Sequence, residues 1–138
     1  MAKVHCLIFL LAVACDPGGV GSGATAAPAV APSSWAERFS LVRADLEQLE
    51  TAHAAKDQDS AVASWEQAYR QRFEPLIEGP VGDAVDSHLI TAVEYEFGRV
   101  LHGLDSPRPA PVQAGLVALR ERLDALELAV AQLPEPGN

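Results

Sequence analysis

Apolar residues recur every three or four positions in four stretches of the chain. This spacing places side chains on one face of an α-helix. The apolar positions, stretch by stretch, are Trp35, Phe39, Val42, Leu46, Leu49 and His53; Val62, Trp65, Tyr69, Phe73 and Leu76; Ile90, Val93, Phe97, Val100 and Leu104; and Val112, Leu116, Leu119, Leu123, Leu126, Val130 and Leu133. The pattern predicts an all-α fold, an antiparallel up-down-up-down four-helix bundle over residues 34–133.

The first two helices have recognisable boundaries. Ser34-Trp35-Ala36-Glu37 matches a capping box, so the first helix is expected to follow Ser34 and run to about Lys56. The second is expected over about Ala61–Glu74, because Pro75 ends or kinks a helix. Gly79, Pro80 and Gly82 then predict a loop.

The last two helices are bounded in the same way. Asp83 or Asp86 is expected to cap the third helix at its start. The fourth begins near Pro111, since proline is tolerated in the first turn of a helix. Residues 134–138, which contain two prolines, are expected to form a short C-terminal tail.

The N-terminal residues indicate export. Residues 1–14 combine Lys3 with a short apolar run that is too brief to span a membrane and is typical of a signal peptide. The segment Leu11 to Cys15 resembles the lipobox of bacterial lipoproteins, which implies lipidation of Cys15 and an anchor in the cell envelope, facing the periplasm or exterior. Ordinary cleavage after Ala12 or Ala14 is the alternative. Residues 15–33, rich in Gly, Ala and Pro, are expected to form a flexible tether.

Composition excludes several classes of function. The formal net charge of −9 argues against nucleic acid as a partner, because phosphate backbones would be repelled. Both cysteines, Cys6 and Cys15, precede the bundle, so no CxxCH haem attachment is possible in it and no haem is expected. No GxSxG or comparable nucleophile motif occurs, and we therefore expect no enzymatic activity.

One set of candidate metal ligands lies near the end of the first helix. Glu50 and His53 form an ExxH pair, and Asp57 lies one turn further along the same face. The three side chains could meet one cation, as carboxylates and histidines do in helical bundles. The simpler interpretation is that His53 is half exposed at the end of the core, flanked by two solvated carboxylates.

The middle of the chain resembles a known family. The run Ala55-Lys56-Asp57, Ala61, Ala68-Tyr69, Phe73-Glu74-Pro75-Leu76 and Glu94-x-x-Phe97 is similar to the extracytoplasmic helical domain fused to bacterial high-affinity iron permeases. The resemblance implies that Glu74 and Glu94 bind iron or another divalent cation, and that an iron permease is the partner. The family often continues FEPLE, whereas here Ile77 takes that glutamate's place and Glu78 comes one residue later.

Two functions follow as hypotheses. The first is a lipid-anchored accessory protein of iron uptake that binds iron or another divalent cation. The alternative is a structural or protein-interaction module of the cell envelope with no metal role, whose many carboxylates serve solubility.

Overall fold

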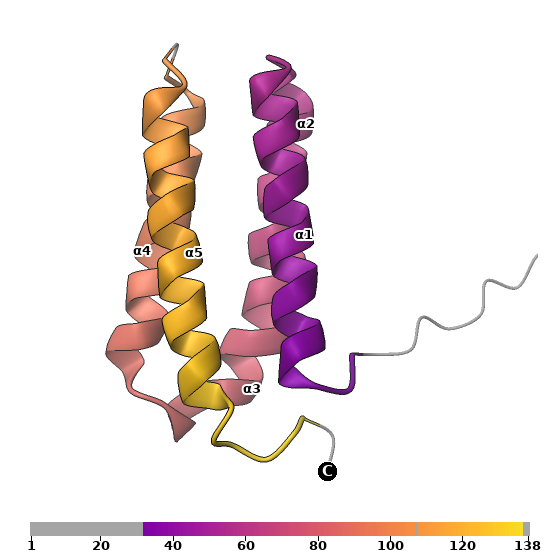
Figure 1. The fold of residues 1–138 in the computed structure, drawn as a ribbon, viewed down its shortest axis with the longest axis vertical. Helices are drawn as coiled ribbons and strands as arrows, with labels where there is room; N and C mark the ends of the chain where they lie inside the picture. The colour runs from indigo at the N-terminus through magenta and orange to yellow at the C-terminus, as the bar shows by residue number, and fades with distance from the viewer. Residues whose placement is uncertain (1–31, 107, 137–138) are drawn as a thin grey trace, which may run out of the picture. The chain divides into compact units, whose positions relative to one another are not determined.

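A computed structural model describes residues 32–106 and 108–136. The chain divides into two units, Met1–Val30 and Ala31–Asn138, and the helices described here belong to the second. Within the described residues there is no strand (Figure 1), which confirms the all-α class. The helices are α1 (Trp35–Ala54), α2 (Gln58–Glu66), the π-helix η1 (Gln67–Glu78), α3 (Gly79–Val81), the 3-10 turn η2 (Gly82–Ala84), α4 (Ser87–Leu104) and α5 (Ala110–Val130). Residues 1–14 and Cys15 lie outside the described residues.

The predicted capping box starts α1. The Ser34 hydroxyl accepts a hydrogen bond from the Glu37 amide at 3.2 Å, and the Glu37 carboxylate accepts one from the Ser34 amide at 3.2 Å. The helix ends at Ala54, slightly before the expected Lys56. Lys56 has a φ of 60°, and Asp57 then caps α2 by accepting a hydrogen bond from the Ser60 amide.

The second helical segment differs from the prediction, because Pro75 neither ends it nor precedes a loop. The backbone changes from α-helix to π-helix at Gln67 and stays helical to Val81. The Gly79 amide donates to the Glu74 carbonyl, five residues back, which is the π-helical pattern. Pro80 has no N–H for the Leu76 carbonyl, and the Arg38 guanidinium of α1 donates to it instead, at 2.6 Å.

The starts of α4 and α5 agree with the sequence. Asp86, one of the two expected caps, accepts a hydrogen bond from the His88 amide at 2.9 Å, while Asp83 lies in η2. Pro111 lies in the first turn of α5, where its missing N–H costs no helical hydrogen bond.

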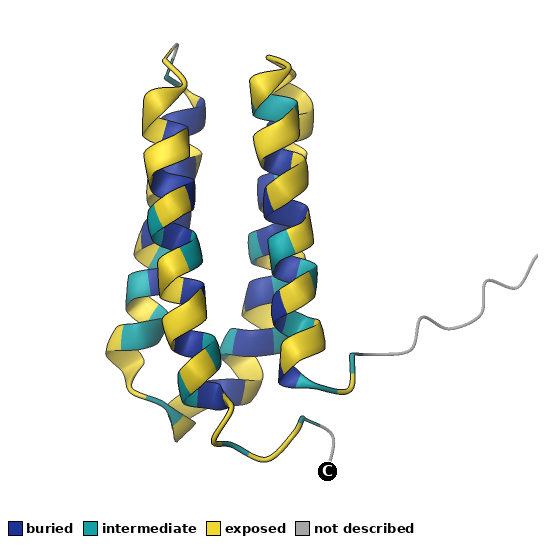
Figure 2. Ribbon diagram, viewed as in Figure 1, coloured by how far each residue is buried: buried dark blue, intermediate teal, exposed yellow. Residues whose placement is uncertain are grey.

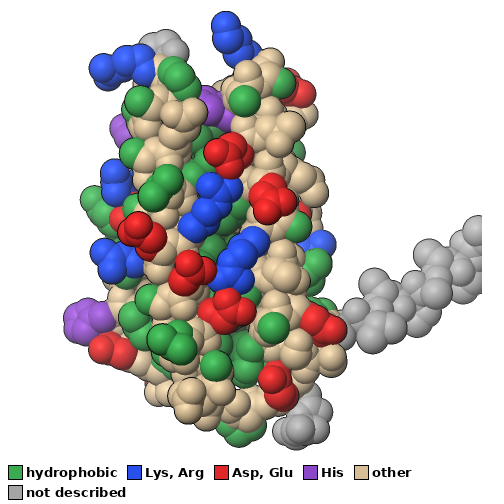
Figure 3. Space-filling model, in the orientation of Figure 1, with side chains coloured by type: hydrophobic (Ala, Val, Ile, Leu, Met, Phe, Trp, Pro, Cys, Tyr) green, Lys and Arg blue, Asp and Glu red, His purple; other side chains and the backbone are tan. Residues whose placement is uncertain are grey.

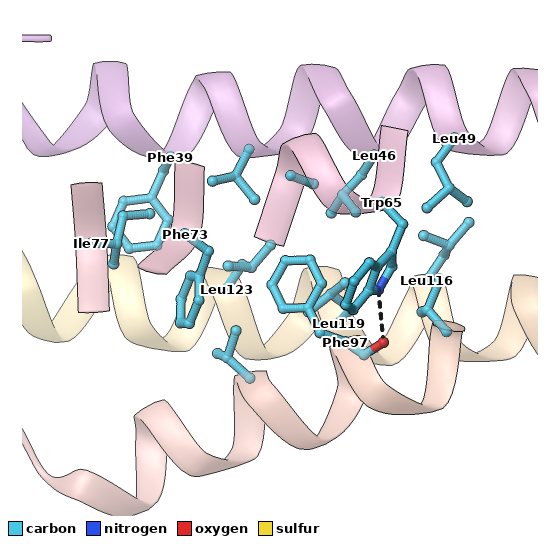
Figure 4. Packing of buried hydrophobic residues seen from close by; sticks show 14 of the residues in the cluster. Phe39, Leu46, Leu49, Trp65, Phe73, Ile77, Phe97, Leu116, Leu119 and Leu123 are labelled. Atoms are coloured by element: carbon cyan, nitrogen blue, oxygen red, sulfur yellow. Dashed lines mark hydrogen bonds between the residues drawn. The ribbon is translucent and has the colours of Figure 1, made fainter. Parts of the chain in front are cut away.

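One apolar core joins the helices, and exposed positions cover the outward faces (Figure 2). The predicted stripes of the first, third and fourth helices are buried, apart from partly buried His53, Ile90 and Leu133, the last of which lies beyond the end of α5. The π-helix changes the buried face of the second segment: Ala68, Phe73 and Ile77 are fully buried, whereas Tyr69 and Leu76 are only partly buried. Several of these core side chains meet around Trp65 and Phe97 in Figure 4.

The helices contact one another in pairs. α1 lies along α2 and η1, and α4 lies along α5, with further contacts between α1 and α5 and between α2 and α4. Trp65 of α2 connects the α1–α2 pair to the α4–α5 pair, since its indole N–H donates to the carbonyl of Phe97 in α4 at 2.9 Å (Figure 4). Acidic and basic side chains alternate along the seam between α1 and α5 (Figure 3), where Arg43 pairs with Asp124 and Glu127, and Arg120 with Glu50.

Candidate functional site

Three carboxylates act on the phenol of Tyr69 where η1 packs against α4. Glu74 and Glu78 belong to η1, and Glu94 belongs to α4. A π-helix has more residues per turn than an α-helix, so side chains four apart, such as Glu74 and Glu78, lie more nearly above one another. We call Glu74, Glu78 and Glu94 the η1–α4 acidic cluster.

The charges of this cluster affect the ionisation of Tyr69. Burial, followed by the negative charges of Glu74, Glu94 and Glu78, raises the pKa of the Tyr69 phenol to about 12. A hydrogen bond with Glu74 contributes in the same direction. Glu74 and Glu94, the two residues singled out by the family resemblance, therefore act electrostatically on the same phenol although they come from different helices.

Glu78 is the member of the cluster with an unsatisfied oxygen. Its Oε2 atom is buried and has no hydrogen-bond partner among the described residues. Burial, followed by the charges of Glu94 and Glu74, raises the pKa of the Glu78 carboxyl. Among residues 32–106 and 108–136, Glu78 takes part in no ion pair, and a bound cation would compensate its charge.

Aromatic packing fixes the position of Tyr69. Its ring stacks on Phe73 with centroids 6.1 Å apart and planes inclined by 17°, and it lies 5.0 Å from the ring of Phe97. Trp65 contacts the other side, at 5.2 Å. The phenol is thus held against the core beside the carboxylates.

The ExxH candidates of α1 have other partners. Glu50 forms an ion pair with Arg120 at 2.7 Å. Asp57 caps α2, and its hydrogen bonds with Ser60 lower the pKa of its carboxyl. His53 is half-buried, and its Nε2 atom is buried without a hydrogen-bond partner among the described residues. The proposed metal role of these three residues stays a prediction.

Glu78 and Tyr69 were not anticipated as parts of a site. The residue pattern placed Tyr69 in the core and treated Glu78 as a displaced family glutamate. The available signal was the spacing of Trp65, Ala68, Phe73 and Ile77 by three, five and four residues, which an α-helix does not accommodate on one face.

In residues 32–106 and 108–136, no three or more His, Cys, Asp or Glu side chains form a group that could hold a metal ion. No helix in the same residues is long and apolar enough to cross a membrane.

Comparison with known proteins adds no relative. No family model matches the chain, and neither a curated protein nor a solved structure matches it. The resemblance to the permease-associated domain therefore depends on the short motifs alone.

Proposed function

We propose that this chain is a lipid-anchored accessory protein of bacterial iron uptake that binds iron or another divalent cation at the η1–α4 acidic cluster. The observation that carries the proposal is the buried Oε2 atom of Glu78, which has no hydrogen-bond partner among the described residues and is subject to the charges of Glu94 and Glu74. Carboxylate oxygens are suitable ligands for hard cations. Glu74 and Glu94 would hold the cation as two protein ligands and water would complete its coordination, since no three such side chains of the described residues form a metal-holding group.

The chemistry of the cluster supports this assignment in two ways. A cation would compensate the charge at the buried, unpartnered Oε2 atom of Glu78. Burial is the main cause of the raised pKa of the Glu78 carboxyl, and a cation would offset the added repulsion from Glu94 and Glu74. Binding would therefore release a proton wherever that carboxyl is protonated. Neither Glu74 nor Glu94 takes part in an ion pair with Lys or Arg among the described residues.

We also infer an antiparallel up-down-up-down bundle. The α1–α2 and α4–α5 connections lie at the same end of the helices in Figure 1, and each joins helices that contact each other along their lengths. In the sequence, a signal peptide over 1–14 and lipidated Cys15 would anchor this bundle through the tether 15–33. An iron permease in the same membrane is the proposed partner.

The test is anaerobic calorimetric titration of the full-length chain with ferrous iron, with manganese, zinc and calcium as comparisons. We expect saturable binding that is lost in Glu74→Gln and in Glu94→Gln. Glu121→Gln serves as the matched control, because Glu121 is an exposed carboxylate of α5. Absence of saturable binding to folded protein, or equal binding by all variants, would reject the cation-binding role.

A second candidate function is a protein-interaction module of the cell envelope. Val117 and Leu128 are 57% and 72% exposed, and eleven residues place them three turns apart on the same side of α5. Exposed apolar side chains in such a row suit contact with a partner protein. Membrane pull-downs with wild type and Leu128→Gln, with and without chelator, distinguish this function by a partner that depends on Leu128 but not on metal.

A further inference from the structure

A second candidate site lies near the C-terminal end of α4. A cavity of about 700 Å³ opens there, next to the connection between α4 and α5. Its lining includes Tyr95, Gly98, Arg99, His102, Ser106 and Arg108. A volume of this order is typical of pockets that bind small molecules.

The polar groups of the cavity are mainly hydrogen-bond donors that carry or can carry positive charge. Arg99 and Arg108 contribute two guanidinium groups, and Asp105 contributes the one carboxylate of the lining. Arg99 is oriented from one side, because its Nη1 donates to the buried Glu96 at 2.9 Å. The other guanidinium donors of Arg99 remain for a ligand.

Gly98 leaves the space that a side chain would fill. A Cβ atom built on Gly98 would meet no other atom within 4 Å. Glycine in the middle of a helix costs about 1 kcal/mol relative to alanine. Here close packing does not require the glycine, in contrast with Gly115, whose Cβ would lie 2.9 Å from Val100. Gly98 is exposed, so the space beside it is open to a ligand.

Further cationic side chains lie near the cavity. A second cavity, of about 370 Å³, shares Ser106 with the first and is lined also by His53, Lys56 and Gln58. Figure 3 shows Lys, Arg and His side chains at the end of the helices where the α1–α2 and α4–α5 connections lie. Asp57 and Asp59 at the start of α2 and Asp105 after α4 lie at this end as well, so its cationic side chains are accompanied by carboxylates.

We propose that the cavity beside Gly98 binds a small phosphate-bearing anion through Arg99 and Arg108. Guanidinium groups hold phosphate oxygens by paired, charge-assisted hydrogen bonds. His102 and Ser106 supply further donors at the same cavity. A cavity of about 700 Å³ suits a small soluble molecule, and we therefore assign the ligand as a free phosphate compound rather than a lipid headgroup in a membrane.

The test is calorimetric titration of the full-length chain with inorganic phosphate, alongside flotation with phosphatidylglycerol vesicles. Gly98→Glu and Gly98→Gln fill the same space and differ in charge. We expect Arg108→Gln and Gly98→Glu each to weaken phosphate binding by about tenfold or more, since tenfold corresponds to about 1.4 kcal/mol and a charge-assisted hydrogen bond contributes about that much. Gly98→Gln should weaken it less than Gly98→Glu.

Arg122→Gln, on the exposed side of α5, is the control and should bind phosphate as the wild type does. Circular dichroism verifies that each variant is folded. The proposal is overturned if folded wild type shows no saturable phosphate binding, or if Arg108→Gln and Gly98→Glu bind as the wild type does. Vesicle binding without phosphate binding would also overturn it, because it would assign the site to a membrane surface.

Discussion

Gly115 of α5 faces Val100 of α4 so closely that a Cβ atom on the glycine would lie 2.9 Å from the Val100 Cγ2 atom. Real Cβ atoms do not approach other atoms to this extent, so a methyl group here would push the two helices apart. The absence of a side chain at Gly115 therefore sets the distance between α4 and α5, on which both proposed sites depend for the position of α4.

Alanine should have opposite effects at Gly115 and Gly98. We expect Gly115→Ala to lower the free energy of unfolding by roughly 1–2 kcal/mol, because overpacking outweighs the gain in helix propensity. Gly98→Ala should raise it by about 0.5–1 kcal/mol, because its Cβ meets nothing. Urea denaturation followed by circular dichroism measures both. A destabilising Gly98→Ala would contradict the open space described at that position.

The acidic cluster should make the free energy of unfolding of the protein decrease as pH rises. The folded-state pKa of Glu78 is raised, so the folded chain holds a proton there at pH values where the unfolded chain has lost it. The contribution of Glu78 to the free energy of unfolding is full in acid and is lost as pH rises through its folded-state pKa. Glu78→Gln removes this loss of stability, and we expect the variant to gain stability over the wild type as pH rises above the ordinary carboxyl pKa of about 4.

Urea denaturation at a series of pH values measures this difference, and Glu121→Gln is the exposed control. A Glu78→Gln variant that loses stability relative to the wild type as pH rises would show that Glu78 has a stabilising partner when ionised, contrary to the description above.

Removing a carboxylate should make the Tyr69 phenol easier to ionise. In a Tyr95→Phe background, which leaves Tyr69 as the remaining tyrosine, we expect Glu94→Gln to bring the pKa of Tyr69 down from about 12. Burial, the largest cause, persists in the variant, so the pKa should remain above that of a free phenol. Alkaline titration of tyrosinate absorbance measures it, with circular dichroism to verify folding. An unchanged pKa would mean that Glu94 does not act on Tyr69.

The anchoring hypothesis has its own test. Cys15→Ser should abolish incorporation of labelled fatty acid and move the protein from the membrane fraction to the soluble fraction. Cys6→Ser is the control and should leave both unchanged, since Cys6 lies within the expected signal peptide. Equal labelling of wild type and Cys15→Ser would exclude lipidation at that cysteine.

Local sequence rules were sufficient where the determining contacts are themselves local. The Ser34–Glu37 capping box and the Asp86 cap involve residues within four positions of one another. The apolar stripes of α1, α4 and α5 were also predicted, because an α-helix buries one face and its period is visible in the sequence.

The second helical segment could not be predicted by those rules. Pro75 would end an α-helix, but the π-helix continues past it, and a distant side chain, Arg38, satisfies the Leu76 carbonyl. The change of period turns Ile77 into the core and places Glu78 one longer turn beyond Glu74. The one-residue displacement of this glutamate in the sequence is thus compatible with a position beside Glu74.

The most direct test of the central claim is to locate a bound cation. Manganese is paramagnetic and broadens the amide resonances of nearby residues in correlation spectra of isotope-labelled full-length protein. At substoichiometric manganese we expect selective broadening of residues around Glu74, Glu78 and Glu94, and loss of that broadening in Glu94→Gln. Broadening centred elsewhere, or none at these residues in folded wild type, would contradict a cation site at the η1–α4 acidic cluster.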